Sequence, residues 1–318
     1  MSNTGFPNMI HELAKINRMA ASGPFQLIAH SERCFAEQVR EAVRCILRGE
    51  HNTRVLMLAG PSASGKTTTA HMLAEAFGEK GVRARIVSLD NFFYGRGIAP
   101  VMPDGEYDYE SLEALNVPLM QQCLYELMEE GASDLPVFDF VAGLPQQERR
   151  RVELASDDIV IFEGIHALNP VITEPLSQDK LLHLFVSVET GCVDGEETVV
   201  SARQIRQLRR ILRDYQFRAC PPQQALRMWK QVCRGEELYI NPFRDTADIC
   251  LNSFHSYEMC VYRGTTLPLL EELTAEERSI SGADVLIERL RAFVPIPCGD
   301  VPERSLLREF VGGGGRQY

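Results

Sequence analysis

The sequence predicts an α/β fold in which a parallel β-sheet is flanked by helices. Short apolar runs recur from residue 55 onward, and segments of helical period separate them. This alternation is typical of strands that are joined by crossover helices. A glycine-rich turn directly after the first apolar run supports the same fold class. The runs predict strands at 55–59, 84–89, 159–162, 182–188 and 247–251.

The remaining segments complete this outline. The periodicity predicts helices at 65–78, 110–130, 199–217, 222–240, 256–272 and 282–293. Between the second and third strands lies an excursion, 91–157, with two possible strands, PVFDF and RRRVELA. We expect an N-terminal helical extension at 1–50, because Phe35, Val39, Val43 and Ile46 recur at helical spacing.

The domain division follows from these elements. We expect the α/β domain to span 51–295 and a C-terminal tail to span 296–318. The end of that tail, VGGGGRQY, offers little to pack and is expected to be mobile.

Composition limits the classes of function. The chain has 318 residues, 45% of them hydrophobic, and a net charge of −11, which argues against general binding of nucleic acid or of anionic membranes. It contains no run of about 18 apolar residues, so no membrane span is expected. No secretory signal is visible, and nine scattered cysteines without a C-x-x-C pair predict reduced thiols and a cytoplasmic location. The sequence leaves the oligomeric state open, a homo-oligomer included.

The strongest motif is GPSASGKT at Gly60–Thr67, a match to G-x-x-x-x-G-K-[ST]. A strand, a glycine-rich turn and a helix in succession direct several backbone N–H groups and a positive helix end at one point. We expect ATP to bind there, with Lys66 on the β- and γ-phosphates and Thr67 on Mg²⁺. The alternative is a purely structural turn. The expected nucleotide-binding run is Gly60, Pro61, Ser62, Ala63, Ser64, Gly65, Lys66, Thr67 and Thr68.

Two carboxylates follow the next two strands. Asp90 ends the second predicted strand and Glu163 ends the third. Because the carboxyl ends of parallel strands share one edge of a sheet, both are expected beside the phosphate loop. Asp90 is a candidate general base, with helix capping as its alternative role. Glu163 is a candidate Mg²⁺ ligand through water, with a surface glutamate as the alternative.

An arginine-rich helix supplies the remaining positive charge. The segment Arg203 to Arg218 holds six arginines in sixteen residues, four of them on one face. Such a face is often merely solvated, but here it is expected to close over the phosphates as a lid. The four are Arg206, Arg209, Arg210 and Arg213.

Several long segments resemble the uridine kinase and phosphoribulokinase family. They are LMLAGPSASGKTTTA, VSLDNFFYGR, DGEYDYESLEAL, PVFDF, IVIFEGIHALNP and LRRILRDYQFR, and the likeness is greatest to bacterial uridine kinase-like proteins, over roughly 8–272. Relatives often carry a threonyl-tRNA synthetase-like region in front, of which this sequence is expected to keep only the helical connector. The resemblance implies a P-loop NTPase fold of the nucleoside/nucleotide kinase type, with a lid helix and a substrate-side insertion. It also implies transfer of the ATP γ-phosphate to a primary hydroxyl, typically the 5′-hydroxyl of a nucleoside such as uridine or cytidine.

The resemblance assigns roles to individual residues. It implies that Asp108 grips the ribose and that Tyr94 and Phe138 contact the acceptor. The lid arginines divide into Arg209 and Arg213 for catalysis, Arg210 for the nucleotide and Arg206 for the acceptor.

The sequence also departs from the family pattern. Phe138 replaces a tyrosine, Gly143 stands where a histidine reads the pyrimidine, and Ala219 replaces a glycine. Pyrimidine specificity is therefore in doubt. Other acceptors, namely a sugar, a sugar phosphate or a pantothenate-like alcohol, stay open, and so does a non-catalytic nucleotide-binding regulator.

Overall fold

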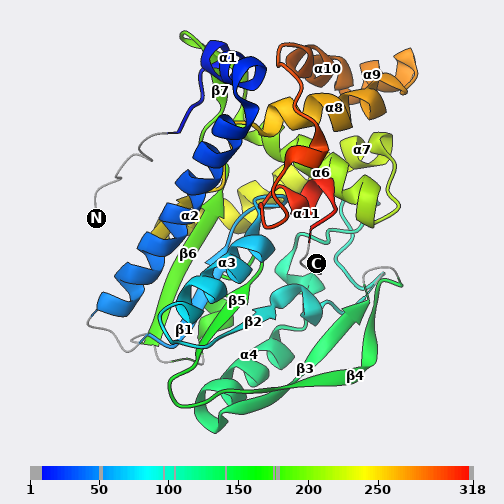
Figure 1. Cartoon of the computed structure of the whole chain (residues 1–318). Helices are drawn as coiled ribbons and strands as arrows, with labels where there is room; N and C mark the ends of the chain where they lie inside the picture. Colours follow the sequence, from blue (N-terminus) through cyan, green and yellow to red (C-terminus); the bar gives the residue numbers. More distant parts are fainter. Residues whose placement is uncertain are drawn as a thin grey trace.

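A five-stranded parallel sheet forms the centre of the protein (Figure 1). The computed structural model describes residues 9–49, 53–95, 97–103, 105–139, 142–174, 176 and 180–314. All five predicted strands are confirmed, with ends that differ by up to two residues. In sheet order they are β2 (Ala84–Ser88), β5 (Ile159–Glu163), β1 (Val55–Ala59), β6 (Leu181–Ser187) and β9 (Ile249–Asn252).

The middle strand β1 is buried on both faces because every one of its residues is apolar. It pairs with β5 and β6, so that Val55 lies opposite Val160 on one side and opposite Leu181 on the other. Leu56 and Leu58 belong to the core on one face of the sheet, and Met57 belongs to the core on the other. This two-sided burial is what an all-parallel sheet requires, and it fixes the phosphate loop after β1.

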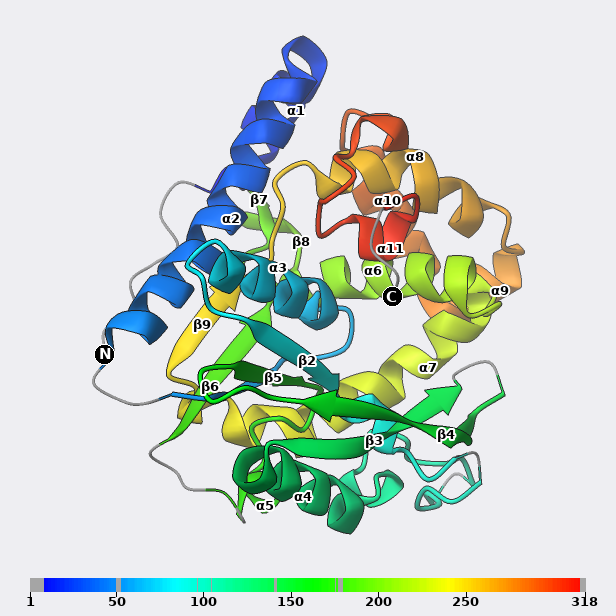
Figure 2. The same cartoon turned by 60° about the horizontal axis from the view of Figure 1, so that its bottom comes forward.

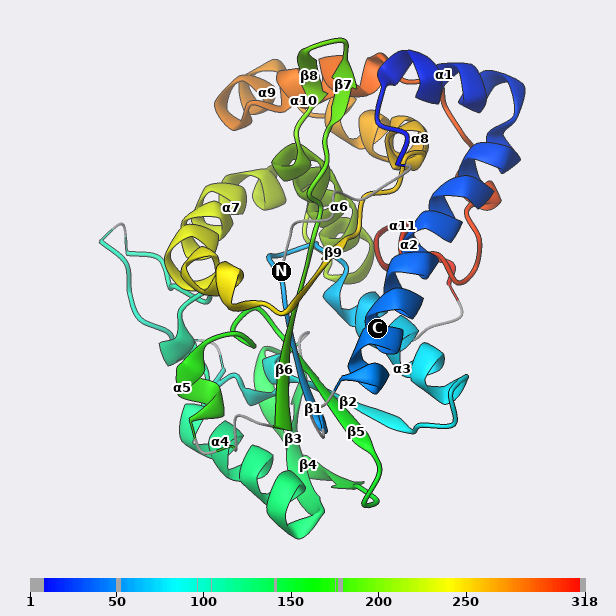
Figure 3. The same cartoon turned by 90° about the vertical axis from the view of Figure 1, so that its left-hand side faces the viewer.

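Two N-terminal helices lie within the segment for which the sequence predicts a helical extension. They are α1 (Leu13–Ser22) and α2 (Pro24–Arg48), and Gly23 lies between them. Pro24 begins α2, a position that suits proline because the first turn of a helix needs no N–H from that residue. The predicted apolar face of α2, from Phe35 to Ile46, is buried. Figure 3 shows α2 alongside α3 (Lys66–Gly78), the helix that follows the phosphate loop.

The excursion after β2 differs in part from the prediction. The predicted helix 110–130 is wrong at its start, because α4 begins only at Val117 (Val117–Tyr125). The Asn116 side chain accepts a hydrogen bond from the Leu119 N–H and caps this helix, which has a proline in its first turn. The two possible strands are confirmed as an antiparallel pair, β3 (Ala132–Asp139) and β4 (Leu144–Glu153), which Figure 2 shows beside the main sheet.

In the second half of the chain, several helices lie near the edge of the sheet that carries the phosphate loop. The predicted helices there are confirmed as α6 (Ala202–Phe217), α7 (Pro222–Gly235), α8 (Glu258–Glu271) and α10 (Ala283–Arg291). The helix expected from 199 begins at 202 because Ser201 forms a capping box with Gln204. Sequence periodicity missed the short elements β7 (Cys192–Asp194), β8 (Glu197–Val200), α5 (Pro170–Thr173), α9 (Ala275–Ser281) and α11 (Arg308–Val311).

The C-terminal segment is more ordered than its glycine-rich sequence indicates. Leu306, Leu307, Phe310 and Val311 are buried in the core, so the expectation that the tail from Val311 has nothing to pack against is wrong for that residue. It is wrong for Gly312 too, which is buried and accepts a hydrogen bond of 2.9 Å from Arg308. Residues 315–318, on which the end of that prediction falls, lie outside the described residues. Among the helices that the structure describes, none is long and apolar enough to cross a membrane.

Candidate active site

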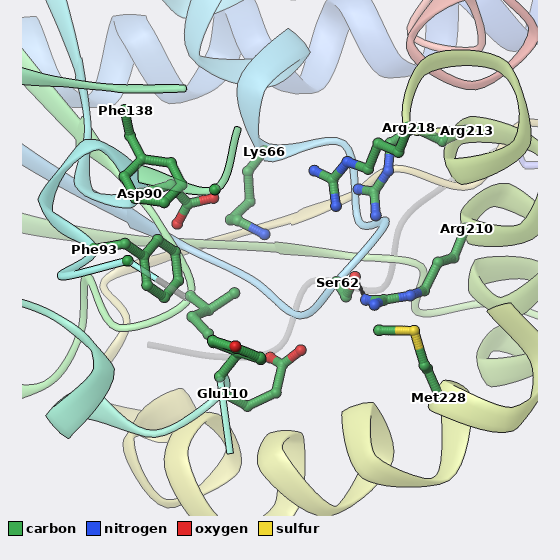
Figure 4. Close-up of a pocket in the computed structure, with 14 residues that line it drawn as sticks. Ser62, Lys66, Asp90, Phe93, Glu110, Phe138, Arg210, Arg213, Arg218 and Met228 are labelled. Atoms are coloured by element: carbon green, nitrogen blue, oxygen red, sulfur yellow. Dashed lines mark hydrogen bonds between the residues drawn. The ribbon is translucent and has the colours of Figure 1, made fainter. Parts of the chain in front are cut away.

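A cavity of about 350 Å³ lies at the carboxyl ends of the parallel strands (Figure 4). Its walls come from several elements: the phosphate loop, the turn after β2, the loop before α4, the β3–β4 pair, the turn after β5, and the helices α6 and α7. Its lining residues are Ser62, Lys66, Asp90, Phe93, Gly95, Tyr109, Glu110, Phe138, Gly143, Ile165, Arg210, Arg213, Arg218 and Met228.

The predicted nucleotide-binding run, Gly60 to Thr68, forms the loop between β1 and α3 together with the first turn of that helix. A Cβ on Gly60 would lie 2.1 Å from the Val186 carbonyl oxygen, so only glycine lets the loop pass β6 so closely. Gly65 has φ +88°, and Ala63 has φ +59°, which strains a residue that carries a side chain. Of this run, Ser62 and Lys66 line the cavity, and Thr67 lies half-buried beside Lys66.

The Lys66 ammonium lies across the mouth of its own loop. It donates a hydrogen bond of 3.2 Å to the Pro61 carbonyl. Burial lowers the pKa of Lys66, while the carboxylates of Glu163, Asp90 and Glu309 act in the opposite direction. A buried cation without a strongly bound anion is unfavourable. The loop is therefore suited to an anionic ligand such as a phosphate.

Asp90 and Glu163 lie at the carboxyl ends of two adjacent strands, the edge of the sheet at which the sequence predicts them. Glu163 is the last residue of β5 and pairs in register with Ser88, at the end of β2. Asp90 lies in the short helical turn Leu89–Phe92 and lines the cavity. A Cβ on Gly164 would lie 2.8 Å from the Leu89 Cβ, so glycine allows the chain after β5 to approach that turn.

The electrostatics of this carboxylate pair favour a cation. Burial raises the pKa of Glu163 to about 7, the nearby Asp90 adds to that shift, and Lys66 opposes it. Two carboxylates so close in a buried site are stabilised when a positive ion lies between them. Their oxygens and the Thr67 hydroxyl are the hard ligands that Mg²⁺ prefers.

Three arginines line the side of the cavity that α6 and its C-terminal end form. Arg210 donates a hydrogen bond of 2.7 Å to the Ser62 hydroxyl of the phosphate loop. Arg210, Arg213 and Arg218 all contact the Asp214 carboxylate, at 3.3, 3.0 and 3.6 Å. Arg218 was missed in the prediction because it lies one turn beyond the chosen helix face, although it belongs to the same arginine-rich segment. The group forms a concentrated positive wall opposite Asp90 (Figure 4).

Arg206 and Arg209 do not line the cavity. Arg209 has no exposed side-chain surface and is bonded to Glu258 at 2.8 and 3.0 Å and to the Ser253 carbonyl at 2.7 Å. Arg206 pairs with Glu236 at 2.7 Å and donates to the Ser62 carbonyl at 3.2 Å.

From these positions the two arginines support the phosphate loop. Arg209 also lies 3.4 Å from the Ala63 carbonyl, so both guanidiniums hold the phosphate loop against α6. The predicted catalytic role of Arg209 and acceptor role of Arg206 do not match where the free protein places them. The physical reason is that a helix face with four arginines is wider than the cavity. Arg210 and Arg213 therefore line the cavity, while Arg206 and Arg209 point into the protein interior.

The buried pair of Arg209 and Glu258 makes a stability prediction. We expect Glu258→Gln to lower the free energy of unfolding by about 3–5 kcal/mol, because it leaves the Arg209 charge buried without its partner. Urea denaturation measures this change. The matched control is Glu237→Gln, which removes an exposed partner of Arg203 and is expected to cost less than about 1 kcal/mol. Equal losses in the two variants would contradict the supporting role of Arg209.

The other wall of the cavity is largely aromatic and apolar. The rings of Phe93 and Phe138 lie 5.7 Å apart at their centroids and are tilted by 54°, and Ile165 and Met228 add apolar surface. Phe138 thus lines the cavity, and its predicted contact with the acceptor stays a prediction. Tyr94 does not, and its neighbour Phe93 takes that position.

Asp108 is placed just outside the cavity lining. It is buried and accepts hydrogen bonds from the Tyr239 hydroxyl at 2.9 Å and from Arg234 at 3.4 Å. Its predicted ribose contact therefore stays a prediction.

Glu110 is a cavity residue that the sequence reading missed. It lines the cavity two positions after Asp108, and its side chain makes no hydrogen bond to the residues that the structure describes. Burial raises the pKa of Glu110, against the effect of Arg210 and Lys66. The backbone of Gly235 packs against it, since a Cβ there would lie 2.4 Å from the Glu110 Cβ. The alternating acidic residues of YDYE could have indicated this site, but the sequence predicts the start of a helix there.

Comparisons with known proteins identify relatives of this chain. Residues 55–259 match the model of the phosphoribulokinase / uridine kinase family. A uridine kinase from Deinococcus deserti is 25% identical over 226 residues, 71% of this chain and 95% of that protein. One from Lactobacillus helveticus is 33% identical over 114 residues, 36% of this chain and 53% of that protein, so the chain spans about half its length.

Solved structures match this chain at low sequence identity. A possible uridine kinase from Bacillus stearothermophilus is 18% identical with a TM-score of 0.47, over 68% of this chain and 97% of that one. The family match itself covers the phosphate loop, both strand-end carboxylates and α6. This chain belongs to the phosphoribulokinase / uridine kinase family and is a phosphotransferase.

Proposed function

We propose that the protein is an ATP- and Mg²⁺-dependent kinase that transfers the γ-phosphate to a primary hydroxyl, most favourably the 5′-hydroxyl of a nucleoside. The observation that carries this proposal is the meeting of Asp90, Lys66 and the phosphate loop at one cavity. Asp90 and Lys66 point toward the same space (Figure 4). Phosphoryl transfer depends mainly on such positioning and on neutralised charge.

The residues have separable tasks in this reaction. The backbone N–H groups of the loop hold the phosphates, and Lys66, Arg210 and Arg213 neutralise their charge. Thr67 and Glu163 would hold Mg²⁺, which when bound supplies further charge neutralisation at the phosphates. The acceptor hydroxyl oxygen forms a bond to the γ-phosphorus as the bond to the bridging oxygen breaks, and ADP leaves. The hydroxyl proton passes to the Asp90 carboxylate.

The acceptor side of the cavity favours a neutral molecule. Figure 4 shows the rings of Phe93 and Phe138 on one side of the cavity and the guanidiniums of Arg210, Arg213 and Arg218 on the other, and Glu110 also lines it. We assign the acceptor to the aromatic side. An acceptor that carries its own phosphate or carboxylate would place an anion near Glu110 and Asp90, where like charges repel. A nucleoside brings a flat ring for the aromatic wall and N–H groups that a carboxylate accepts. These features favour a nucleoside over a sugar phosphate or a pantothenate-like acid.

A substrate panel tests the proposal. The purified protein is incubated with MgATP and with nucleosides, free sugars, sugar phosphates and pantothenate, and ADP formation is followed for each. We expect acceptor-dependent ADP formation with at least one nucleoside. Turnover with sugar phosphates alone would overturn the acceptor class, and tight ATP binding without turnover on any alcohol would favour the regulatory alternative.

Glu110 makes a sharper prediction within that panel. We expect Glu110→Gln to lower the ratio of kcat/KM for a nucleoside to kcat/KM for a sugar phosphate by about tenfold, because one repelling charge is removed beside the acceptor. Steady-state kinetics with both acceptors measure the ratio. Glu113→Gln, an exposed change in the same segment, is the control. An unchanged ratio in Glu110→Gln would mean that this carboxylate does not select the acceptor.

A further inference from the structure

A carboxylate from the C-terminal segment occupies the end of the phosphate loop. The Thr68 N–H and hydroxyl both donate to one oxygen of Glu309, at 3.3 and 2.6 Å. Glu309 comes 241 residues later in the chain, lies on α11 and is mostly buried. This contact uses a backbone N–H of the run Gly60–Thr68, which the sequence predicts to bind nucleotide phosphates.

The position within the loop indicates which phosphate would bind there. In a loop of this kind the N–H groups hold the α- and β-phosphates, and the lysine reaches the β- and γ-phosphates. Thr68 is the last N–H of the run, two residues beyond Lys66, and is therefore the one left for the α-phosphate, next to the nucleoside. A carboxylate and a phosphate are both anionic acceptors, and the same N–H cannot serve both. The Glu309 charge also reaches the phosphate site, where it favours protonated Lys66.

The segment that carries Glu309 is firmly packed. Leu306, Leu307 and Phe310 are buried, and the Phe310 ring centroid lies 5.0 Å from the Arg209 guanidinium. Leu306 contacts the loop directly, since a Cβ on Gly65 would lie 2.6 Å from its side chain. Figure 1 shows α11 beside α6. The short side chain of Glu309, rather than the whole segment, is therefore the part that a nucleotide must move.

The size of the cavity agrees with an occupied nucleotide site. About 350 Å³ is near the lower end of what a single small ligand needs, and a kinase of this type must hold two. Ser62 and Lys66 line the open space, whereas Gly65, Thr67 and Thr68 do not. The open part of the cavity therefore excludes Thr68, whose N–H and hydroxyl are bonded to Glu309 of the C-terminal segment.

We propose that Glu309 is an intramolecular competitor of the nucleotide α-phosphate, so that the C-terminal segment restrains ATP binding until this carboxylate turns away. The inference rests on the proposed function, because it assumes a nucleotide in the phosphate loop. Its consequence is a weaker apparent affinity: only molecules with Glu309 displaced can bind, and the apparent Kd rises by the inverse of their fraction. Anything that holds Glu309 away from Thr68 would activate the enzyme.

Calorimetric binding of a non-hydrolysable ATP analogue and of pyrophosphate, each with Mg²⁺, tests the proposal. We expect Glu309→Gln to bind the analogue about five- to tenfold more tightly than the wild type, as when one charged hydrogen bond no longer competes. Pyrophosphate, which fits the β- and γ-phosphate positions without Thr68, should gain clearly less affinity from this substitution than the analogue does. Glu303→Gln, an exposed change on the same segment, should alter neither affinity. Thermal unfolding checks that each variant is folded.

A second variant keeps the test decisive. Glu309→Asp retains the charge but shortens the reach by one methylene, and it should also tighten binding of the analogue. Analogue binding that is unchanged or weaker in both Glu309 variants would overturn the competitor role and would make Glu309 a structural support of the loop. If neither the wild type nor any variant bound a nucleotide, the proposed function itself would fail. The two failures are therefore distinct.

Discussion

Lys66→Ala is expected to lower kcat/KM for MgATP by about 10³-fold, because it removes a preorganised charge from the transferring phosphate. Lys66 is the first residue of α3 and lies across the loop mouth on the Pro61 carbonyl. Lys66 is half-buried at the cavity, so its charge is only partly screened by water and its loss should affect the transition state strongly. Steady-state kinetics with the preferred acceptor measure the change.

The same variant should not unfold the free protein. Burial lowers the pKa of Lys66, which means that the folded state disfavours its charged form. Alanine at this position is therefore expected to keep the thermal midpoint close to that of the wild type. Lys80→Ala, an exposed change beyond the end of α3, serves as the kinetic control. A Lys66→Ala enzyme within tenfold of wild-type kcat/KM would show that the phosphate is held elsewhere.

Asp90→Asn is expected to lower kcat by about 10²–10⁴-fold, the range that a general base contributes. Asparagine has nearly the same shape, so the turn Leu89–Phe92 should keep its place, but the amide cannot accept the hydroxyl proton. Binding of an ATP analogue should change little, because the phosphate loop and Lys66 are intact. Single-turnover rates and analogue affinity separate the two effects.

The control for Asp90 is Asp157→Asn, an exposed carboxylate before β5. It should retain full activity. If Asp90→Asn kept the wild-type kcat, the proton would have to pass to another group, and Glu110 and Glu163 are the other cavity or strand-end carboxylates nearby. The prediction thus tests the assignment of the base rather than the presence of kinase activity.

The core of the site could be predicted because it depends on local sequence and on one rule of topology. The run from Val55 to Thr68 contains its own strand, turn and helix start. Asp90 and Glu163 come next to it because parallel strands present their carboxyl ends at one edge. Neither inference required knowledge of contacts between distant segments.

The residues that were missed or misplaced depend on such distant contacts. The buried acids Glu236 and Glu258 draw Arg206 and Arg209 away from the cavity, and periodicity within α6 cannot reveal those partners. Glu309 reaches Thr68 from a segment that reads as a tail. The predicted helix 110–130 starts too early because apolar spacing alone does not mark its first residue. Asn116 and Pro118 mark that start, as the cap and the first-turn proline of α4.

Ala219 shows a smaller difference of the same kind. Its replacement of a glycine reads as a mild change in the sequence, yet the structure gives it φ +48°. An alanine in this left-handed region costs roughly 1 kcal/mol relative to glycine. The strain lies directly after Arg218, a residue of the cavity wall. Backbone angles of this kind cannot be read from residue identity alone.

Phosphorus NMR of one reaction mixture tests the central claim, that a hydroxyl acceptor between Asp90 and the phosphate loop receives the γ-phosphate. The protein is mixed with MgATP and the nucleoside that the substrate panel identifies, and the spectrum is followed over time. We expect a new phosphomonoester signal that grows in step with ADP and is greatly reduced in Asp90→Asn. Formation of ADP and inorganic phosphate at the same rate with and without the nucleoside would contradict it.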